Sequence, residues 1–381
     1  MTGFADARAR AMAETGDPLG LRRQSKAIRD AAIADLPTHL ARLAEMVERN
    51  GGRVHWAGDA AEARQIILDI ARRHGVKLIV KSKSMATEEI ALNHALEAAG
   101  IEPVETDLGE YIAQKAHEPP SHILAPIVHK NKEVENEGNA RLVTSAPRVH
   151  VAVMGADKVI PTLDDLPVLL KSLTRSATGQ AISVYVSLIS GPRREGDPDG
   201  PDEFHLVIMD NGRSSLYGTE FQEMLNCIRC GACLNVCPVY KSVGGHAYGS
   251  VYSGPMGAVL MPGLGGLRAF GDLSHASSLC GACMDACPVM IDLPRMLLAW
   301  RRQVPHSALE TLAFRLARLG MTNPLLYRLG VIFGRLGLRL WVRDGRIRGG
   351  PPPIDRWTHG RDFPPIAAKT FQERWREGRA P

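Results

Sequence analysis

Seven cysteines, all between positions 227 and 287, constrain this chain more than any other feature of its 381 residues. The first motif, Cys227-Ile-Arg-Cys230-Gly-Ala-Cys233-Leu-Asn-Val-Cys237-Pro, has the spacing C-x2-C-x2-C-x3-C-P. Three closely spaced thiolates in one tight loop reach three corners of a single [4Fe–4S] cube, and the fourth cysteine ligates a neighbouring cluster. The motif therefore predicts a domain that holds two iron–sulfur clusters.

The second motif ends in the same way, but Ser277 stands where its leading cysteine is expected. With three thiolates, its cluster is expected to be a [3Fe–4S] centre, or a [4Fe–4S] centre with water, Ser277 or a partner group on the fourth iron. The other cluster is expected to be [4Fe–4S]. Crossed ligation assigns Cys227, Cys230, Cys233 and Cys287 to cluster 1, and Cys237, Cys280 and Cys283 to cluster 2.

Zinc is the alternative metal, because C-x2-C pairs also form zinc sites. Structural zinc sites usually have four ligands that come as two pairs, however. Seven cysteines with two Cys-Pro endings fit that pattern poorly. Ser277 reads first as an ordinary loop hydroxyl. His246 and His275 read as hydrogen-bonding or surface residues. The candidates for tuning the reduction potentials are Arg229 and the backbone amides at Gly231 and Gly281.

The cysteine-free part of the chain alternates between strand and helix patterns, which indicates a parallel sheet covered by helices. A helix over 24–50 is expected to divide at Pro37, and Asp59 is expected to cap a helix over 60–75. Further helices are expected at 87–100 and 163–177. Strands are expected at 53–57, 77–82, 101–107, 122–129, 149–155, 182–190 and 204–212.

The loop Lys81-Ser82-Lys83-Ser84 follows one of these strands and leads toward a helix. Ligands of open α/β sheets bind beyond the carboxyl ends of the strands, so these four residues are a candidate site for a carboxylate or phosphate. A solvated basic loop is the competing interpretation. The chain has no G-x-G-x-x-G after a strand and no Walker loop, so no motif supports binding of nicotinamide, flavin or ATP.

Charge is distributed unevenly along the chain. Residues 295–381 contain 17 Lys and Arg against six Asp and Glu, whereas the rest of the chain is acidic overall. An acidic body argues against nucleic-acid binding. The basic helix with Leu325, Ile332 and Leu340 between arginines reads as a helix that docks on a partner or a membrane surface, or as an ordinary closing helix. No secretory signal or membrane span is recognisable, so a cytoplasmic location, with possible membrane association, is expected.

Several stretches together resemble one family, the lactate utilization protein B family of iron–sulfur subunits in bacterial L-lactate utilization complexes. They are VKSKSMATEEIALNHALEAAGIEPVETDLGEYI, EGNARLVTSAPRVHVAVMG, RSATGQ, GPRREGDPDGP, CIRCGACLNVCPVYKSVGGHAYGSVYSGPMGAVL and SSLCGACMDACPV. The resemblance implies an N-terminal LUD domain, an α/β fold of the sugar-isomerase and CoA-transferase-like type, followed by an α-helical ferredoxin domain. It also implies two partners, a subunit with cysteine-rich CCG repeats and a shorter LUD-domain subunit. All seven cysteines match the family, and serine at position 277 is the family's own residue.

One departure from the family concerns the segment between Lys130 and Asn136, where five residues replace several tens. The expected deletion removes sheet elements, so the LUD domain is expected to be incomplete. The predicted parts are a helical segment at 1–50, a LUD-like domain at 51–215, a ferredoxin domain at 216–300 and a basic helical and irregular tail at 301–381.

The predicted function is electron transfer within an oxidoreductase complex that converts L-lactate to pyruvate, with no catalytic residue assigned to this chain. Two alternatives stay open. The chain could serve another respiratory dehydrogenase as its iron–sulfur subunit, although such a subunit is expected to lack the LUD-like half. It could also be a LUD-domain enzyme for an acyl or phosphate substrate, with clusters that are only structural.

Overall fold

The computed structural model describes residues 2–82, 84–106, 114, 139–183, 186–305, 308–347, 349, 358, 363–365 and 367–378. The chain forms two compact units, Met1–Val304 and Pro305–Pro381, which are described separately. The expected strand at 122–129 and the junction at 130–136 lie outside the described residues. The boundaries predicted for the four parts of the chain, at residues 50, 215 and 300, stay predictions.

Three helices open the first unit: α1 (Thr2–Ala13), α2 (Pro18–Ala34) and α3 (Leu36–Arg49). The predicted division near Pro37 is confirmed, because α2 ends at Ala34 and α3 begins at Leu36 with Pro37 in its first turn. Proline is tolerated there because the first amides of a helix have no intrahelical partner. The helix before the break begins earlier than expected, at Pro18, where the Asp17 side chain accepts a hydrogen bond from the Gly20 amide at 2.8 Å.

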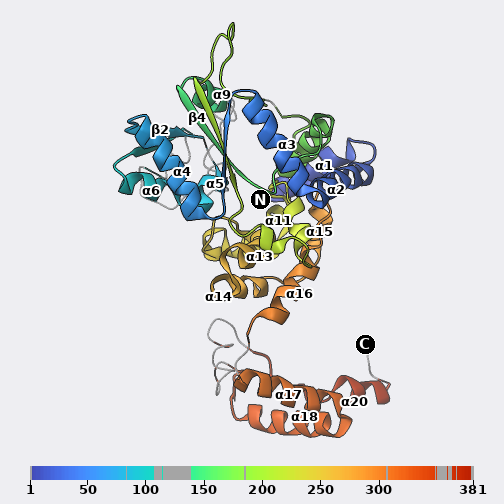
Figure 1. The fold of residues 1–381 in the computed structure, drawn as a ribbon. Helices are drawn as coiled ribbons and strands as arrows, with labels where there is room; N and C mark the ends of the chain where they lie inside the picture. The colour runs from blue at the N-terminus through green and yellow to red at the C-terminus, as the bar shows by residue number, and fades with distance from the viewer. Residues whose placement is uncertain are drawn as a thin grey trace. The chain divides into compact units, whose positions relative to one another are not determined.

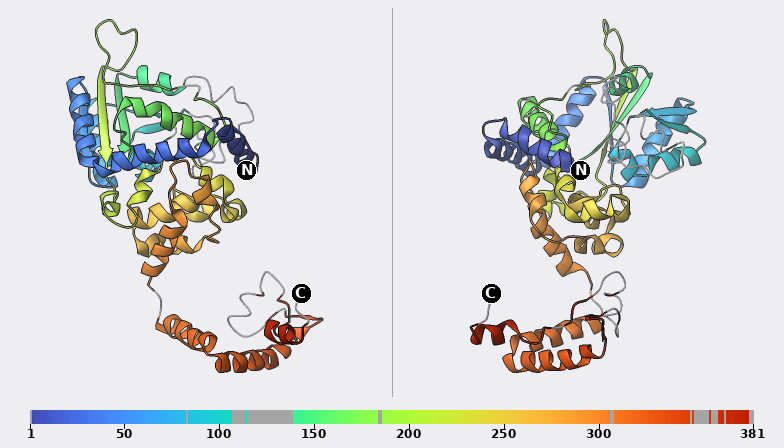
Figure 2. Two further views of the ribbon diagram at one scale, coloured as in Figure 1. Left: turned by 90° about the vertical axis from the view of Figure 1, so that its right-hand side faces the viewer. Right: turned by 180° about the vertical axis from the view of Figure 1, so that it is seen from behind.

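The first unit also contains a parallel sheet of three strands in the order β1-β5-β4. Its strands are β1 (Arg53–Ala57), β5 (Glu203–Met209) and β4 (Val149–Gly155). The central strand β5 is covered on both faces, because Phe204, Leu206 and Ile208 pack with the α3 side and Val207 and Met209 pack with the side of α4 (Ala60–Arg73). Figure 1 and the rear view in Figure 2 show α3 and α4 on opposite sides of this sheet. Burial on both faces explains why β5 is apolar without interruption from Leu206 to Met209.

A second, separate parallel pair consists of β2 (Leu78–Lys81) and β3 (Glu102–Glu105). The chain between them forms α5 (Met85–Glu89) and α6 (Leu92–Ala98) instead of the single helix expected over 87–100. Ala91 has φ 49° between the two helices, and this left-handed backbone conformation interrupts the helix. The caps at Asp59 and Ser84 hold the start of α4 and α5 through the amides of Glu62 and Thr87.

The strand expected over 182–190 is wrong for the described residues of that segment. Residues 182, 183 and 186–190 have no strand pairing, and Ile182 and Leu188 are more than 70% exposed. A strand is stable only when it pairs with a neighbour, and among the described residues none lies in register beside this segment. The helix expected over 163–177 is confirmed as a 3-10 turn at Leu163–Asp165 followed by α10 (Leu166–Ala177). A short helix, α9 (Asn139–Ser145), precedes β4.

The remainder of the first unit is helical and surrounds the cysteines. Phe221 stacks on Trp300 with ring centroids 3.7 Å apart, and the Trp300 indole donates a hydrogen bond to the carbonyl of Val259 at 2.8 Å. Ile33 of α2 belongs to the same hydrophobic core, so the N-terminal helices pack directly on this part. The helices are α11 (Ala232–Val236), α12 (Pro238–Val243), α13 (Gly254–Gly265), α14 (Leu267–Phe270), α15 (Ala282–Ala286) and α16 (Leu293–Gln303), with 3-10 turns at Ser214–Leu216, Gln222–Asn226, His246–Tyr248 and Gly271–His275.

The second unit contains the helices α17 (Ala308–Thr322), α18 (Pro324–Arg339) and α20 (Phe371–Arg376) and a short antiparallel pair, β6 (Val342–Arg343) and β7 (Arg346–Ile347). Large apolar side chains such as Leu325, Phe333 and Leu340 are exposed on α18 or at its end. Among the described residues, no helix has both the length and the apolar character that crossing a membrane requires. Docking of this basic part on a partner or a membrane surface stays a prediction.

Candidate iron–sulfur site

The two cysteine motifs fold into loops with the same backbone conformation. Arg229 and Leu279 occupy equivalent positions with φ 59° and 55°, and Gly231 and Gly281 follow with φ 74° and 85°. Each glycine then starts a five-residue helix, α11 in the first motif and α15 in the second, and these helices pack against each other (Figure 1). The two matching backbone positions and the matching helix that follows them show that the second motif is a structural repeat of the first.

Ser277 takes the structural place of Cys227 in this repeat. The Cys227 sulfur accepts a hydrogen bond from the Arg229 amide at 3.4 Å, and the Ser277 hydroxyl accepts one from the Leu279 amide at 3.1 Å. The hydroxyl therefore already serves as a turn-forming acceptor, as expected for an ordinary loop serine.

Four of the seven thiols surround one cavity. Its lining includes Cys227, Cys230 and Cys233 from the first motif and Cys287 from the end of the second. Burial raises the pKa of Cys230 and Cys233, and neighbouring thiols of the same four raise it further. Burial also raises the pKa of Cys287 to about 11. The structure thus places together the four residues predicted for cluster 1, including the one from the distant motif.

The other three thiols form a second set. Burial raises the pKa of Cys283 to about 11, and the nearby thiols of Cys237 and Cys280 contribute in the same direction. Cys280 is exposed, and the Ala282 amide lowers its pKa by hydrogen bonding. None of the seven cysteines is in a disulfide. Both sets contain thiol donors only, and every member except Cys280 is partly or fully buried. Such sets suit the soft, thiolate-ligated iron of iron–sulfur clusters.

Positive charge gathers around the first set. From α2, the Arg22 side chain donates to the backbone carbonyls of Cys287 and Met284 at 3.0 and 3.2 Å. Arg8 of α1 lies close enough to interact electrostatically with Cys230 and Cys287. The Lys158 ammonium donates a 2.7 Å hydrogen bond to the carbonyl of Cys227. Residues outside the cysteine motifs therefore create a cationic environment for these four thiols.

Arginines of the N-terminal helices are functional candidates that the sequence reasoning missed. Arg29 of α2 is 2% exposed and donates to the carbonyls of Leu225 and Asn226, immediately before the first motif. The sequence does contain a signal for these arginines, because Arg22, Ser25 and Arg29 recur at positions i, i+3 and i+7 and so form a polar stripe on one helix face.

Of the predicted tuning residues, Arg229 stacks its guanidinium over the Tyr252 ring at 4.2 Å and points a nitrogen at the Met256 sulfur.

A buried ion-pair network links the sheet to this helical region. Arg213, which follows β5, donates to both carboxylate oxygens of Glu89 at 2.8 and 2.7 Å and to Asp157 at 2.7 Å. These three side chains are at most 5% exposed. The Tyr252 hydroxyl, from the segment before α13, donates to Glu89 at 2.5 Å. The network therefore fixes α5 and the ends of β4 and β5 against the cysteine-containing helices.

Two residues of the predicted anion site, Lys81 and Ser84, make hydrogen bonds to other parts of the protein. The Lys81 ammonium is 7% exposed and bonds Glu105 at 2.5 Å and Asn93 at 2.9 Å, so a buried carboxylate already neutralises it. Ser84 caps α5, and Ser82 lines a cavity between β2 and β4. Lys83 lies outside the described residues. The anion site stays a prediction. His246 and His275 lie in 3-10 turns, and neither lines the cavity of the four thiols.

Family models match three parts of the chain. A model described as LUD domain matches residues 40–135 and 133–209, a 4Fe-4S dicluster domain matches 223–291, and a model described as lactate utilisation protein B, C-terminal, matches 299–379. The expected LUD and ferredoxin architecture is confirmed. The two LUD segments meet at the position of the expected deletion.

Curated relatives extend over most of the chain. A lactate utilization protein B of Geobacillus kaustophilus is 43% identical over 413 residues, covering 92% of this chain and 87% of the relative. Those of Bacillus licheniformis and Bacillus subtilis are 43% and 42% identical, covering 98% and 96% of this chain and 91% and 89% of the relatives. These alignments exceed the 381 residues of the chain, so the relatives contain residues that have no counterpart here. No solved structure matches. The identity and coverage establish that the chain belongs to the lactate utilization protein B family.

Proposed function

We propose that this chain is the electron-relay subunit of a complex that oxidises L-lactate to pyruvate. The name of its relatives supplies the pathway, and the two sets of thiols, each drawn from both motifs, carry the proposal of two clusters. Cluster 1 is [4Fe–4S] on Cys227, Cys230, Cys233 and Cys287, and cluster 2, on Cys237, Cys280 and Cys283, is [3Fe–4S] or [4Fe–4S].

Passage through the proposed clusters would proceed one electron at a time. Oxidation of lactate to pyruvate releases two electrons and two protons, whereas an iron–sulfur cluster accepts one electron at a time. The chain's own residues hold the two clusters next to each other, since α11 and α15 are in contact and each motif contributes to both sets. We infer that the two electrons leave a substrate-oxidising partner one by one and pass through this chain to an acceptor.

The partners in the proposal are the CCG-repeat subunit and the shorter LUD-domain subunit. The match to a LUD domain weakens the alternative of another respiratory dehydrogenase, whose iron–sulfur subunit is not expected to contain one. In the competing LUD-enzyme reading, Lys81 would need to bind an anion, yet its charge is already paired with Glu105. The relay therefore explains more of the described contacts.

Lactate-dependent reduction of the clusters tests the relay. The anaerobic chain, mixed with both proposed partners and L-lactate, is expected to develop the EPR signal of reduced clusters, and D-lactate serves as the control. A strain that lacks this chain is expected to regain growth on L-lactate with the wild-type sequence and not with Cys230→Ser. Clusters that remain oxidised with L-lactate, or full rescue by Cys230→Ser, would contradict the proposal.

The uneven charge predicts different reduction potentials for the two clusters. Cations near the first set stabilise the reduced, more negative form, so cluster 1 is expected to have the higher potential. Arg8→Gln is expected to lower that potential by tens of millivolts, because about 1 kcal/mol of lost interaction corresponds to about 40 mV for one electron. EPR-monitored redox titration measures the shift, and Arg10→Gln, at an exposed position of the same helix, is the control. Equal shifts in both variants would refute the role of Arg8.

A further inference from the structure

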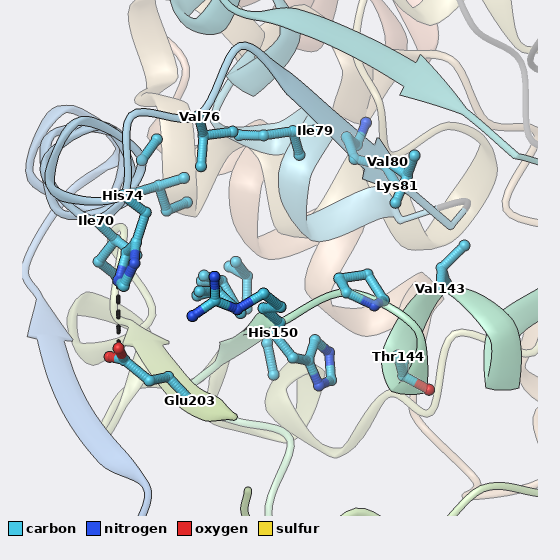
Figure 3. Close-up of a pocket in the computed structure, with 18 of the residues that line it drawn as sticks. Ile70, His74, Val76, Ile79, Val80, Lys81, Val143, Thr144, His150 and Glu203 are labelled. Carbon is cyan, nitrogen blue, oxygen red and sulfur yellow. Dashed lines mark ion pairs between the residues drawn. The ribbon is translucent and has the colours of Figure 1, made fainter. Parts of the chain in front are cut away.

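Three potential metal ligands meet where α4 ends beside the start of β5. His74 follows the last turn of α4, and Glu203 and His205 point to the same side of β5. The His74 Nε2 atom lies 3.6 Å from one Glu203 oxygen, and the His205 Nε2 atom lies 3.5 Å from the other. All three ligand atoms lie within 4.8 Å of one another. Figure 3 shows His74 and Glu203 facing each other across the edge of a cavity.

These separations are too long for good hydrogen bonds but suit a shared metal ion. Zinc binds histidine nitrogen and carboxylate oxygen at about 2.0–2.2 Å in a tetrahedral arrangement. Two ligands at that bond length and angle lie roughly 3.3–3.5 Å apart. Each of the two contacts, made by a different oxygen of Glu203, is therefore close to the separation of two ligand atoms on one zinc ion.

His205 supplies an independent observation. Its side chain is fully buried, yet its Nε2 atom has no hydrogen-bond partner among the described residues. A buried polar atom without a partner is costly, and metal ligation would satisfy it. The other ring nitrogen, Nδ1, lies 2.9 Å from Nε2 of His55, so a hydrogen bond on that side fixes the orientation of the ring.

We propose that His74, Glu203 and His205 form a binding site for one zinc-type divalent ion, with an open fourth position. His74 and Glu203 line a cavity of about 670 Å³, through which water reaches that position. Arg53 competes for the site, since it bonds Glu203 at 2.5 Å, but its side chain is 57% exposed and free to turn toward solvent. Two histidines and one carboxylate favour zinc over magnesium or calcium, which prefer oxygen ligands alone.

Zinc retention by the cluster-loaded chain tests this site without relying on activity. The anaerobic holoprotein is incubated with zinc, passed through a desalting column and analysed for zinc and iron. We expect about one retained zinc ion with nitrogen and oxygen neighbours at about 2.0–2.2 Å by X-ray absorption, and no sulfur shell at about 2.3 Å. His74→Ala and Glu203→Gln are each expected to weaken zinc affinity by at least about tenfold.

The exposed His94 of α6 provides the matched control, since His94→Ala removes a histidine that does not belong to the site. His94→Ala is expected to bind zinc as the wild type does. Equal zinc affinity in His74→Ala and wild type would overturn the proposal. So would a sulfur shell together with loss of iron, because that result would place the zinc on the cysteines.

Discussion

Cys287→Ser is expected to remove the same EPR signal as Cys230→Ser, although the two cysteines belong to different motifs. Both line one cavity with Cys227 and Cys233, so each replacement takes one of four thiolates from cluster 1. Iron content is expected to fall by about four atoms per chain in either variant. Iron analysis combined with EPR of the anaerobically reduced protein measures the loss.

Cys237→Ser is the matched comparison, because Cys237 closes the first motif but belongs to the set with Cys280 and Cys283. It is expected to spare the cluster 1 signal and to eliminate the cluster 2 signal. Ligation within each motif would give the opposite grouping: Cys237→Ser would then resemble Cys230→Ser, and Cys287→Ser would differ from both. Such a grouping would refute the crossed assignment. Loss of all iron in every variant would equally contradict two separately held clusters.

Arg213→Leu is expected to destabilise the first unit severely. The guanidinium is the shared partner of Glu89 and Asp157, and its removal leaves the buried Glu89 without a counter-ion and Asp157 with Lys158 alone. Breaking a buried ion pair from one side costs about 3–5 kcal/mol, which is a large part of the stability of an ordinary domain. The midpoint of urea unfolding, followed by circular dichroism under anaerobic conditions, measures the effect.

Two further variants keep this test informative if Arg213→Leu does not fold. Arg213→Lys retains the charge but not the two-pronged contact with Glu89, so an intermediate loss is expected. Arg302→Leu removes an exposed arginine that pairs with Glu220, and the expected change is below about 1 kcal/mol. Equal unfolding midpoints for wild type and Arg213→Lys would show that the two-pronged contact with Glu89 contributes little to the stability of the first unit.

The same network predicts how acid acts on the fold. Burial opposes ionisation of Glu89 and Asp157, but the neighbouring cations, Arg213 for Glu89 and Lys158 with Arg213 for Asp157, outweigh it and hold both pKa values below the ordinary range. The unfolded state therefore binds more protons in acid than the folded state does. The stabilisation is complete above the unfolded pKa values of about 4, and it is lost as the pH falls through and below them.

Local patterns in the sequence determined the motifs and most of the elements. Cysteine spacing, together with the positions of Gly231 and Gly281, implies two equivalent loops, because each ligand loop needs a residue with a left-handed backbone in the same place. The apolar run of β5 can be read directly from the sequence. The caps at Asp17 and Asp59 bind backbone amides only three residues further along the chain. The strand expected over 182–190 was wrong because a strand depends on a partner that the local sequence does not specify.

The surroundings of these motifs were decided only by the tertiary structure. Arg8, Arg22 and Arg29 are far from the cysteines in sequence. Only the packing of α1 and α2 on the helical core brings Arg8 and Arg22 to Cys287 and Arg29 to Cys227. Likewise, His74 and His205 meet because α4 returns beside β5, and Lys81 is neutralised by Glu105 from the neighbouring strand. The sequence by itself predicted which cysteines hold the proposed clusters, since the motif spacing can be read from the chain. The cations near the first set of thiols, and the separate group of His74, Glu203 and His205, come from long-range packing, which no local pattern encodes.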